Sequence, residues 1–237
     1  MDEEDKILAR QAIDYIKVNK RKLIEEFASP STFPADEAPI SVFMAGSPGA
    51  GKTEFSKRLI EVFENKDIKK IIRIDADEIR EMLPGYIGTN SQIFQGACSK
   101  GVDKLHDSAL KNKQNFILDG TFSNYEISYK NIKRSVDKNR SVSIIYLYQD
   151  PLIAWQFTKR REILEGRYIP KESFIRQLFA AKENVNKIKE IFDKKVEIYL
   201  IEKDFNIGLM KIKVNIKNID NHISMRYTES ELESELL

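Results

Sequence analysis

The chain has 237 residues, and its 39 basic and 37 acidic side chains leave a formal net charge of +2. This length suits one large domain with extensions, and the balanced charge argues against a nucleic-acid or membrane partner. One cysteine and two histidines exclude an internal disulfide and a zinc cluster, and no apolar run is long enough to span a membrane. We therefore expect a cytoplasmic protein.

The N-terminal segment, up to about residue 28, has the pattern of one amphipathic helix. Ile13, Ile16, Leu23 and Phe27 fall on one side of it and charged residues on the other. Its basic residues at 17–22 are flanked by acids, which favours a solvated helix face over a nucleic-acid arm. A linker at 29–34 then leads to the first strand.

Residues 40–45 are a short apolar run, typical of a strand that is covered on both faces. Residues 46–53 then match the pattern G-x-x-x-x-G-K-T in full, and apolar residues recur at helical spacing after them. Glycines let backbone N–H groups surround a polyphosphate, and the following helix adds positive potential there. The motif predicts a nucleotide site formed by Gly46, Ser47, Pro48, Gly49, Ala50, Gly51, Lys52 and Thr53. In such a site the lysine reaches the β- and γ-phosphates and the threonine hydroxyl ligates Mg²⁺.

Further strands are predicted at residues 70–74, 115–118, 141–147 and 196–201, and helices at 91–112, 150–166 and 170–194. Strands that alternate with helices predict a three-layer α/β fold of the P-loop NTPase type, with a mainly parallel central sheet and an added N-terminal helix. Residues 211–217 alternate as an edge strand, and we expect the acidic tail at 229–237 to be loosely ordered.

Acidic residues follow two of these strands, at the edge where open α/β sheets bind ligands. Asp75 and Asp77 share a face if strand geometry continues, so one could reach a phosphate acceptor while the other, Asp75, supports the metal. Asp119 closes another strand and is a second candidate for the acceptor pocket or the Mg²⁺ shell. Helix capping explains Asp77 equally well on its own, but several acids beside one phosphate loop favour a catalytic role.

A basic segment at residues 158–167 follows the fourth strand and is a candidate lid. On a continuous helix, Arg160 and Arg167 are seven residues apart and share a face, whereas Arg161 does not. Two arginines above a nucleotide can clamp its phosphates and stabilise the transition state. The alternative is a set of surface arginines paired with Glu162 and Glu165.

In their order along the chain, these features resemble the zeta-toxin family of kinases over roughly residues 38–185. The resemblance rests on the phosphate loop, on Asp75-Ala76-Asp77 followed by a helix and Pro84, on Asp119-Gly120-Thr121 and on the two arginines. It implies ATP or GTP with Mg²⁺ as the phosphate donor and UDP-N-acetylglucosamine as the acceptor, phosphorylated on the 3′-hydroxyl. It also implies a small helical antitoxin as a protein partner.

The resemblance further implies a role for each matching residue. Lys52 and Thr53 would bind nucleotide and metal, and Asp77 would be the base that orients the acceptor hydroxyl. The phosphate clamp would be Arg160 with Arg167, and the sugar-nucleotide pocket would include Asp119 and Thr121.

The chain departs from the family on the acceptor side. Asp119 stands where glutamate is more usual, and Phe122-Ser123 replaces a stretch that often includes an arginine. The segment between the two lid arginines is also short.

We expect an N-terminal helical extension and linker (1–36), a P-loop kinase domain (37–205) and a C-terminal edge strand and tail (206–237).

Three other classes compete with this interpretation. A polynucleotide 5′-kinase or another P-loop metabolite kinase would share the loop, the base and the arginines, but the balanced charge speaks mildly against a nucleic-acid acceptor. A nucleotide-driven switch or motor ranks lower, because there is no N-K-x-D motif and Asp119 is followed by glycine rather than glutamate. A catalytically dead scaffold conflicts with the intact Lys52, Thr53 and Asp77.

Overall fold

The computed structural model describes residues 2–65, 70–204, 209–223 and 226–236. A six-stranded sheet in the order β2-β3-β1-β4-β5-β6 forms its centre. The strands are β1 (Ile40–Ala45), β2 (Ile71–Asp75), β3 (Asn115–Asp119), β4 (Ser141–Tyr148), β5 (Val196–Asp204) and β6 (Leu209–Lys213). All neighbours are parallel except β5 and β6. The predicted fold class is therefore confirmed.

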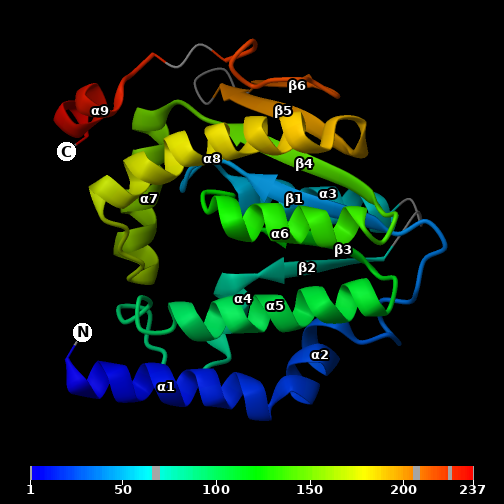
Figure 1. The fold of residues 1–237 in the computed structure, drawn as a ribbon. Coiled ribbons are helices and arrows are strands. Elements are labelled where there is room, and N and C mark those ends of the chain that lie inside the picture. Colours follow the sequence, from blue (N-terminus) through cyan, green and yellow to red (C-terminus); the bar gives the residue numbers. More distant parts are fainter. Residues whose placement is uncertain (1, 66–69, 205–208, 224–225, 237) are drawn as a thin grey trace.

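Helices cover both faces of the sheet (Figure 1). One face carries α5 (Gln95–Lys111), α6 (Tyr125–Val136) and α8 (Lys171–Phe192), and the other carries α3 (Lys52–Asn65). Strand β1 shows why both layers are needed, because Phe43 packs in the core of the first face and Met44 in that of the second. The sequence analysis did not predict α6. The helix predicted to reach residue 194 ends at Phe192, and a 3₁₀ turn (Asp193–Lys195) follows it.

Two further helices, one short and one of 15 residues, lie beyond the carboxyl ends of the strands. They are α4 (Ala76–Glu81), which begins directly after β2, and α7 (Pro151–Glu165) after β4. Asp150 caps α7, with Pro151 in its first turn, as predicted, and Gly166 ends it in the left-handed conformation. Parallel strands end at one edge of a sheet, so the phosphate loop, α4 and α7 meet there.

The N-terminal segment forms two helices, α1 (Glu3–Val18) and α2 (Lys20–Ala28), where one was predicted. Asn19 separates them, because its backbone N–H and its side-chain amide both donate to the carbonyl oxygen of Tyr15. Both helices pack along α5, and Ile16 and Leu23 are buried in the main core. No helix within the described residues is long and apolar enough to cross a membrane.

The C-terminal part differs from expectation in two respects. The edge strand β6 occupies residues 209–213 rather than 211–217. The tail is not loosely ordered: Thr228 and Glu231 form a capping box that starts α9 (Glu229–Glu235), and Leu232 is fully buried beside α8. The domain boundary proposed between residues 205 and 206, and Leu237, lie outside the described residues.

Candidate active site

The phosphate loop is a bend in the chain between β1 and α3 that only glycine can make at two points. Gly46 has a φ of +132°, and a Cβ there would lie 2.3 Å from the carbonyl oxygen of Leu147. Gly49 has a φ of +72°, and a Cβ there would lie 2.0 Å from the carbonyl oxygen of Ala154 in α7. The loop is therefore held tightly against β4 and α7, with the N-terminus of α3 at its end.

Lys52 is buried within this loop, and 9% of the residue is exposed. Its Nζ donates to the carbonyl oxygens of Gly46, at 3.0 Å, and Ser47, at 2.6 Å. Burial lowers the pKa of Lys52 to about 8, in spite of the nearby carboxylate of Asp119. An anionic ligand at the loop would counter this shift and favour the charged amine.

A cavity of about 820 Å³ opens over the loop and is large enough for a nucleotide with a second small molecule. Most of its walls come from the loop, the α4 region, the end of β3 and the α7 region, with smaller parts from the starts of α5 and α8 and from β5. The predicted residues among them are Pro48, Gly49, Ala50, Gly51, Lys52, Thr53, Asp75, Asp77, Asp119, Thr121, Arg160 and Arg167.

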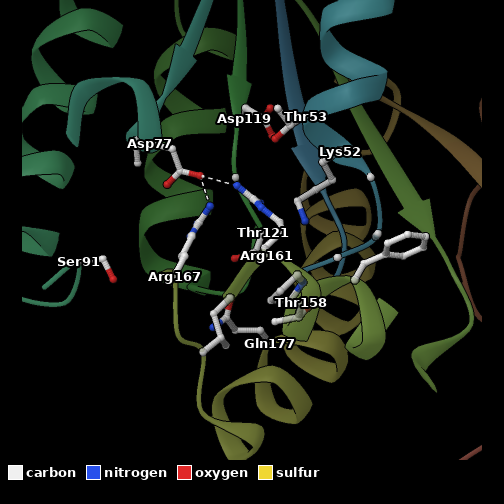
Figure 2. Close-up of a pocket in the computed structure, with 18 of the residues that line it drawn as sticks. Lys52, Thr53, Asp77, Ser91, Asp119, Thr121, Thr158, Arg161, Arg167 and Gln177 are labelled. Carbon is white, nitrogen blue, oxygen red and sulfur yellow. Dashed lines mark hydrogen bonds and ion pairs between the residues drawn. The ribbon is translucent and has the colours of Figure 1, made fainter. Parts of the chain in front are cut away.

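Asp77 lies across this cavity from the loop and is surrounded by arginines (Figure 2). Its Oδ1 accepts from Arg80 Nη1 at 2.5 Å, and its Oδ2 pairs with Arg167 and lies 3.7 Å from Arg161 Nη2. Burial alone would raise the pKa of Asp77, but Arg167, Arg80 and Arg161 outweigh it and lower that pKa. The carboxylate therefore stays ionised at neutral pH.

The arginine beside Arg167 is Arg161 and not Arg160, so the predicted geometry of the pair was wrong. The spacing rule assumed one continuous helix, whereas α7 ends at Glu165 and Arg167 follows the left-handed Gly166. Arg161 projects from the last turns of α7 toward Asp77. Arg160 also lines the cavity, but it is exposed. Within the described part of the chain, Asp77 forms ion pairs with Arg161 and Arg167 and not with Arg160.

Asp75 and Asp77 do not share a strand face, which corrects a second expectation. Strand β2 stops at Asp75, and Asp77 is already in α4. Asp75 Oδ1 accepts from the backbone N–H of Asp77 at 2.9 Å, so Asp75 and not Asp77 is the helix cap. Its Oδ2 pairs with the guanidinium of Arg73, which leaves both oxygens engaged. Burial, with Asp77 and Asp119 nearby, raises the pKa of Asp75 to about 6.

At the end of β3, Asp119 and Thr121 contact the phosphate-loop region directly. Asp119 Oδ2 accepts from Ser56 Oγ of α3 at 2.9 Å, while Oδ1 takes no part in that contact. The carbonyl oxygen of Thr121 accepts from the backbone N–H of Gly46 at 3.2 Å. Phe122 follows in the left-handed conformation, with a φ of +64°, a strained backbone that often accompanies functional sites.

The donor set fits a magnesium ion that is held mainly by a nucleotide. In the described part of the chain, three or more His, Cys, Asp or Glu side chains nowhere gather as a metal site. Mg²⁺ in nucleotide sites usually takes one or two protein ligands and keeps several waters. Thr53, Asp75 and Asp119 all line the cavity. Both oxygens of Asp75 are engaged, whereas Asp119 contacts Ser56 and Arg73 through Oδ2, so the geometry favours Asp119 over Asp75.

Sequence reasoning missed Arg73, Arg80 and Arg161. A charged residue inside an apolar strand was a usable signal for Arg73, because such a charge needs partners. The i, i+3 spacing from Asp77 was a usable signal for Arg80. For Arg161 the signal was Gly166, whose position predicts the end of a helix.

The family model described as zeta toxin matches residues 24–214 of the chain. This match covers both sides of the cavity and the second half of α2, and it extends beyond the region of the resemblance noted above.

Solved structures show the same fold at low sequence identity. One, from the PezAT chromosomal toxin–antitoxin system of Streptococcus pneumoniae, has a TM-score of 0.66 and 16% identity, covering 98% of this chain and 93% of the other. The AvrRxo1-ORF1:-ORF2 complex with ATP has a TM-score of 0.60 and 13% identity, covering 93% and 74%. The Pnkp1/Rnl/Hen1 RNA repair complex has a TM-score of 0.51 and 16% identity, covering 78% and 51%.

Proposed function

The chain belongs to the zeta toxin family, and from this we propose that it is a kinase that transfers the γ-phosphate of ATP to a sugar nucleotide. The proposed acceptor is UDP-N-acetylglucosamine, and the proposed product carries a phosphate on its 3′-hydroxyl. The observation that carries the proposal is the position of Asp77 with Arg161 and Arg167, across one cavity from the phosphate loop.

The donor binds at the phosphate loop. Backbone N–H groups of residues 46–53 and the start of α3 hold its phosphates, and Lys52 exchanges its carbonyl contacts for the β- and γ-phosphate oxygens. An ATP-bound neighbour of the same fold supports ATP as the ligand. Bound Mg²⁺ would neutralise charge on the phosphates, and Thr53 and Asp119 are the residues proposed to hold it.

Asp77 accepts the hydrogen bond of the acceptor hydroxyl and takes its proton as the phosphoryl group is transferred. An ionised carboxylate with a lowered pKa is a weak base, so its main contribution is orientation of the hydroxyl. Arg161 and Arg167 stand beside it, where they can stabilise the negative charge of the phosphoryl group in transit. Asp119 and Thr121 then contact the acceptor at the end of β3.

We further propose a cytoplasmic protein that is controlled by a small helical antitoxin. Support comes from the PezAT neighbour, which is itself part of a toxin–antitoxin system. Co-expression with genes next to its own, followed by isolation of the complex, would test for such a partner.

Incubation of the purified protein with ATP, Mg²⁺ and a panel of acceptors tests the proposed reaction. The panel contains UDP-N-acetylglucosamine, other UDP-sugars and 5′-hydroxyl oligonucleotides, with products scored by mass. We expect one added phosphate on UDP-N-acetylglucosamine only. Phosphate on an oligonucleotide instead would move the function to polynucleotide kinases.

The change Asp77→Asn tests the base directly. We expect kcat to fall about 10²–10⁴-fold, because the uncharged amide orients the hydroxyl less well and cannot accept its proton, while ATP affinity measured by calorimetry stays unchanged. Loss of ATP binding in this variant would contradict the assignment and indicate that Asp77 supports the nucleotide or its metal.

A further inference from the structure

Arg73 is a buried arginine in the middle of β2, and it is not a wall of the cavity. Its side chain is 8% exposed, and all of its guanidinium nitrogens have partners. Nε donates to Ser56 Oγ at 3.2 Å, Nη1 pairs with Glu78, and Nη2 pairs with Asp75 and lies 3.3 Å from Asp119 Oδ2. Burial of a charge is unfavourable unless its partners offset the lost hydration, so a buried arginine in a strand with three isoleucines needs the partners that surround it.

Ser56 connects Arg73 to the phosphate-loop helix. It is fully buried in α3, one turn after Lys52 and Thr53. Its hydroxyl accepts from Arg73 Nε and lies 2.9 Å from Asp119 Oδ2 and 3.0 Å from the carbonyl oxygen of Thr53. The carboxylate is the stronger acceptor, so Arg73, Ser56 and Asp119 form a closed ring of hydrogen bonds. This ring fixes the end of β3 relative to the start of α3.

Arg73 also compensates the negative charge of the carboxylates around it. Asp75 and Asp119 are register partners on neighbouring parallel strands, so two carboxylates end side by side in a buried place. Carboxylates at such a separation repel each other, and Glu78 adds a third negative charge from α4. Arg73 is the cation that contacts all three, while Arg80, Arg161 and Arg167 contact Asp77.

We propose that Arg73 is a positioning residue for phosphoryl transfer, holding Asp119 at a fixed place between the phosphate loop and the acceptor. The inference rests on the proposed function, because it gives Asp119 its task in the reaction. Arg73 does not line the cavity, so it acts through Asp119 and Ser56. Its removal therefore impairs transfer and leaves nucleotide binding at the loop in place.

A double-mutant cycle tests this role. We expect Arg73→Gln to lower kcat about 10–100-fold, since a displacement near 1 Å has effects of that size, with the Kd for ATP without Mg²⁺ unchanged by calorimetry. Asp119→Asn and the double variant complete the cycle. The double variant should lose no more activity than the more impaired single variant, because the two residues act along one path. Arg73→Lys keeps the charge and should recover part of the loss.

Two further variants keep the test decisive. Ser56→Ala removes one hydrogen-bonding group of the ring but no charge. If Arg73→Gln does not fold, Ser56→Ala takes its place in the double-mutant cycle with Asp119→Asn. Arg58→Gln, on the exposed side of the same helix α3, is the matched control and should behave as wild type.

Three results would overturn the inference. They are wild-type kcat in a folded Arg73→Gln, losses that multiply in the double variant, or ATP binding that is lost with transfer. A wild-type protein that phosphorylates no acceptor would overturn the proposed function instead, and the inference with it.

Discussion

The two sides of the cavity are built in different ways. The phosphate loop is eight consecutive residues, and Lys52 bonds to carbonyl oxygens only five and six residues away. The opposite side joins Asp77 to Arg167, ninety residues further along the chain, and to Arg161 in α7. The loop side is a local backbone conformation. The opposite side forms by contact between segments that are far apart in the sequence, and it depends on where α7 ends.

This contrast explains which side could be recognised from sequence. A local conformation requires a fixed pattern of residue types, which can be recognised in the sequence. Where distant segments come into contact, the sequence around one residue does not indicate which residue is its partner. We expect changes on the local side to abolish nucleotide binding and changes on the distant side to affect transfer.

Of the further changes that follow, Lys52→Met is expected to have the largest effect. The methionine fills the same space without the charge, so phosphate contacts are lost in both ground and transition states. Turnover should fall on the order of 10³-fold, and ATP affinity measured by calorimetry should fall with it. Unchanged affinity would show that backbone groups alone hold the nucleotide, and the contrast between the two sides would weaken.

An intermediate effect is expected for Arg161→Gln, with Arg160→Gln as its matched neighbour. Arg161 lies beside Asp77, so its loss should lower kcat about 10–100-fold with little change in ATP affinity. Arg160 is exposed, and its loss should change kcat less than about twofold. Steady-state kinetics of both variants would test this difference. A larger loss of kcat in Arg160→Gln than in Arg161→Gln would favour the pair of Arg160 and Arg167 that the sequence spacing predicted.

The smallest effect is expected away from the cavity, at another contact between distant segments. His106 of α5 is fully buried between the rings of Phe43 and Phe116, and burial with the nearby Arg134 lowers its pKa to about 3. The unfolded chain takes up this proton near pH 6.5, so stability is complete above that pH and declines as pH falls toward 3. The slope is at most about 1.4 kcal/mol for each pH unit.

Urea unfolding at several pH values checks this expectation. In His106→Leu the free energy of unfolding should depend less on pH below about 6.5. Identical slopes in wild type and His106→Leu would mean that His106 takes up its proton at the same pH in the folded and the unfolded protein.

Much of the fold followed from sequence because each strand of the parallel part of the sheet is a mainly apolar run. The strands of the parallel sheet and the start of α7 at Asp150 were predicted in this way. Asn19 was not recognised as a break, because an asparagine that bonds back to Tyr15 looks like any polar residue of a helix face. The capping box at Thr228 was overlooked because the tail is acidic throughout.

The candidate site was less predictable beyond the phosphate loop. Asp77 was named, but its environment follows from the end of β2 at Asp75 and the left-handed Gly166, each of which redirects a side chain. Arg73 was passed over as part of a strand, although a charge in an apolar strand signals buried partners.

The strand order has a consequence for how the protein is made. Strand β1 lies between β3 and β4, both of which are synthesised after it. A growing chain on the ribosome therefore carries the whole phosphate-loop sequence long before the loop has either neighbour, and Arg161 and Arg167 arrive later still. Parallel pairing between distant strands also forms slowly. The cavity at the strand ends therefore takes shape late in translation, after the strands beside the phosphate loop and the arginines opposite it have been synthesised.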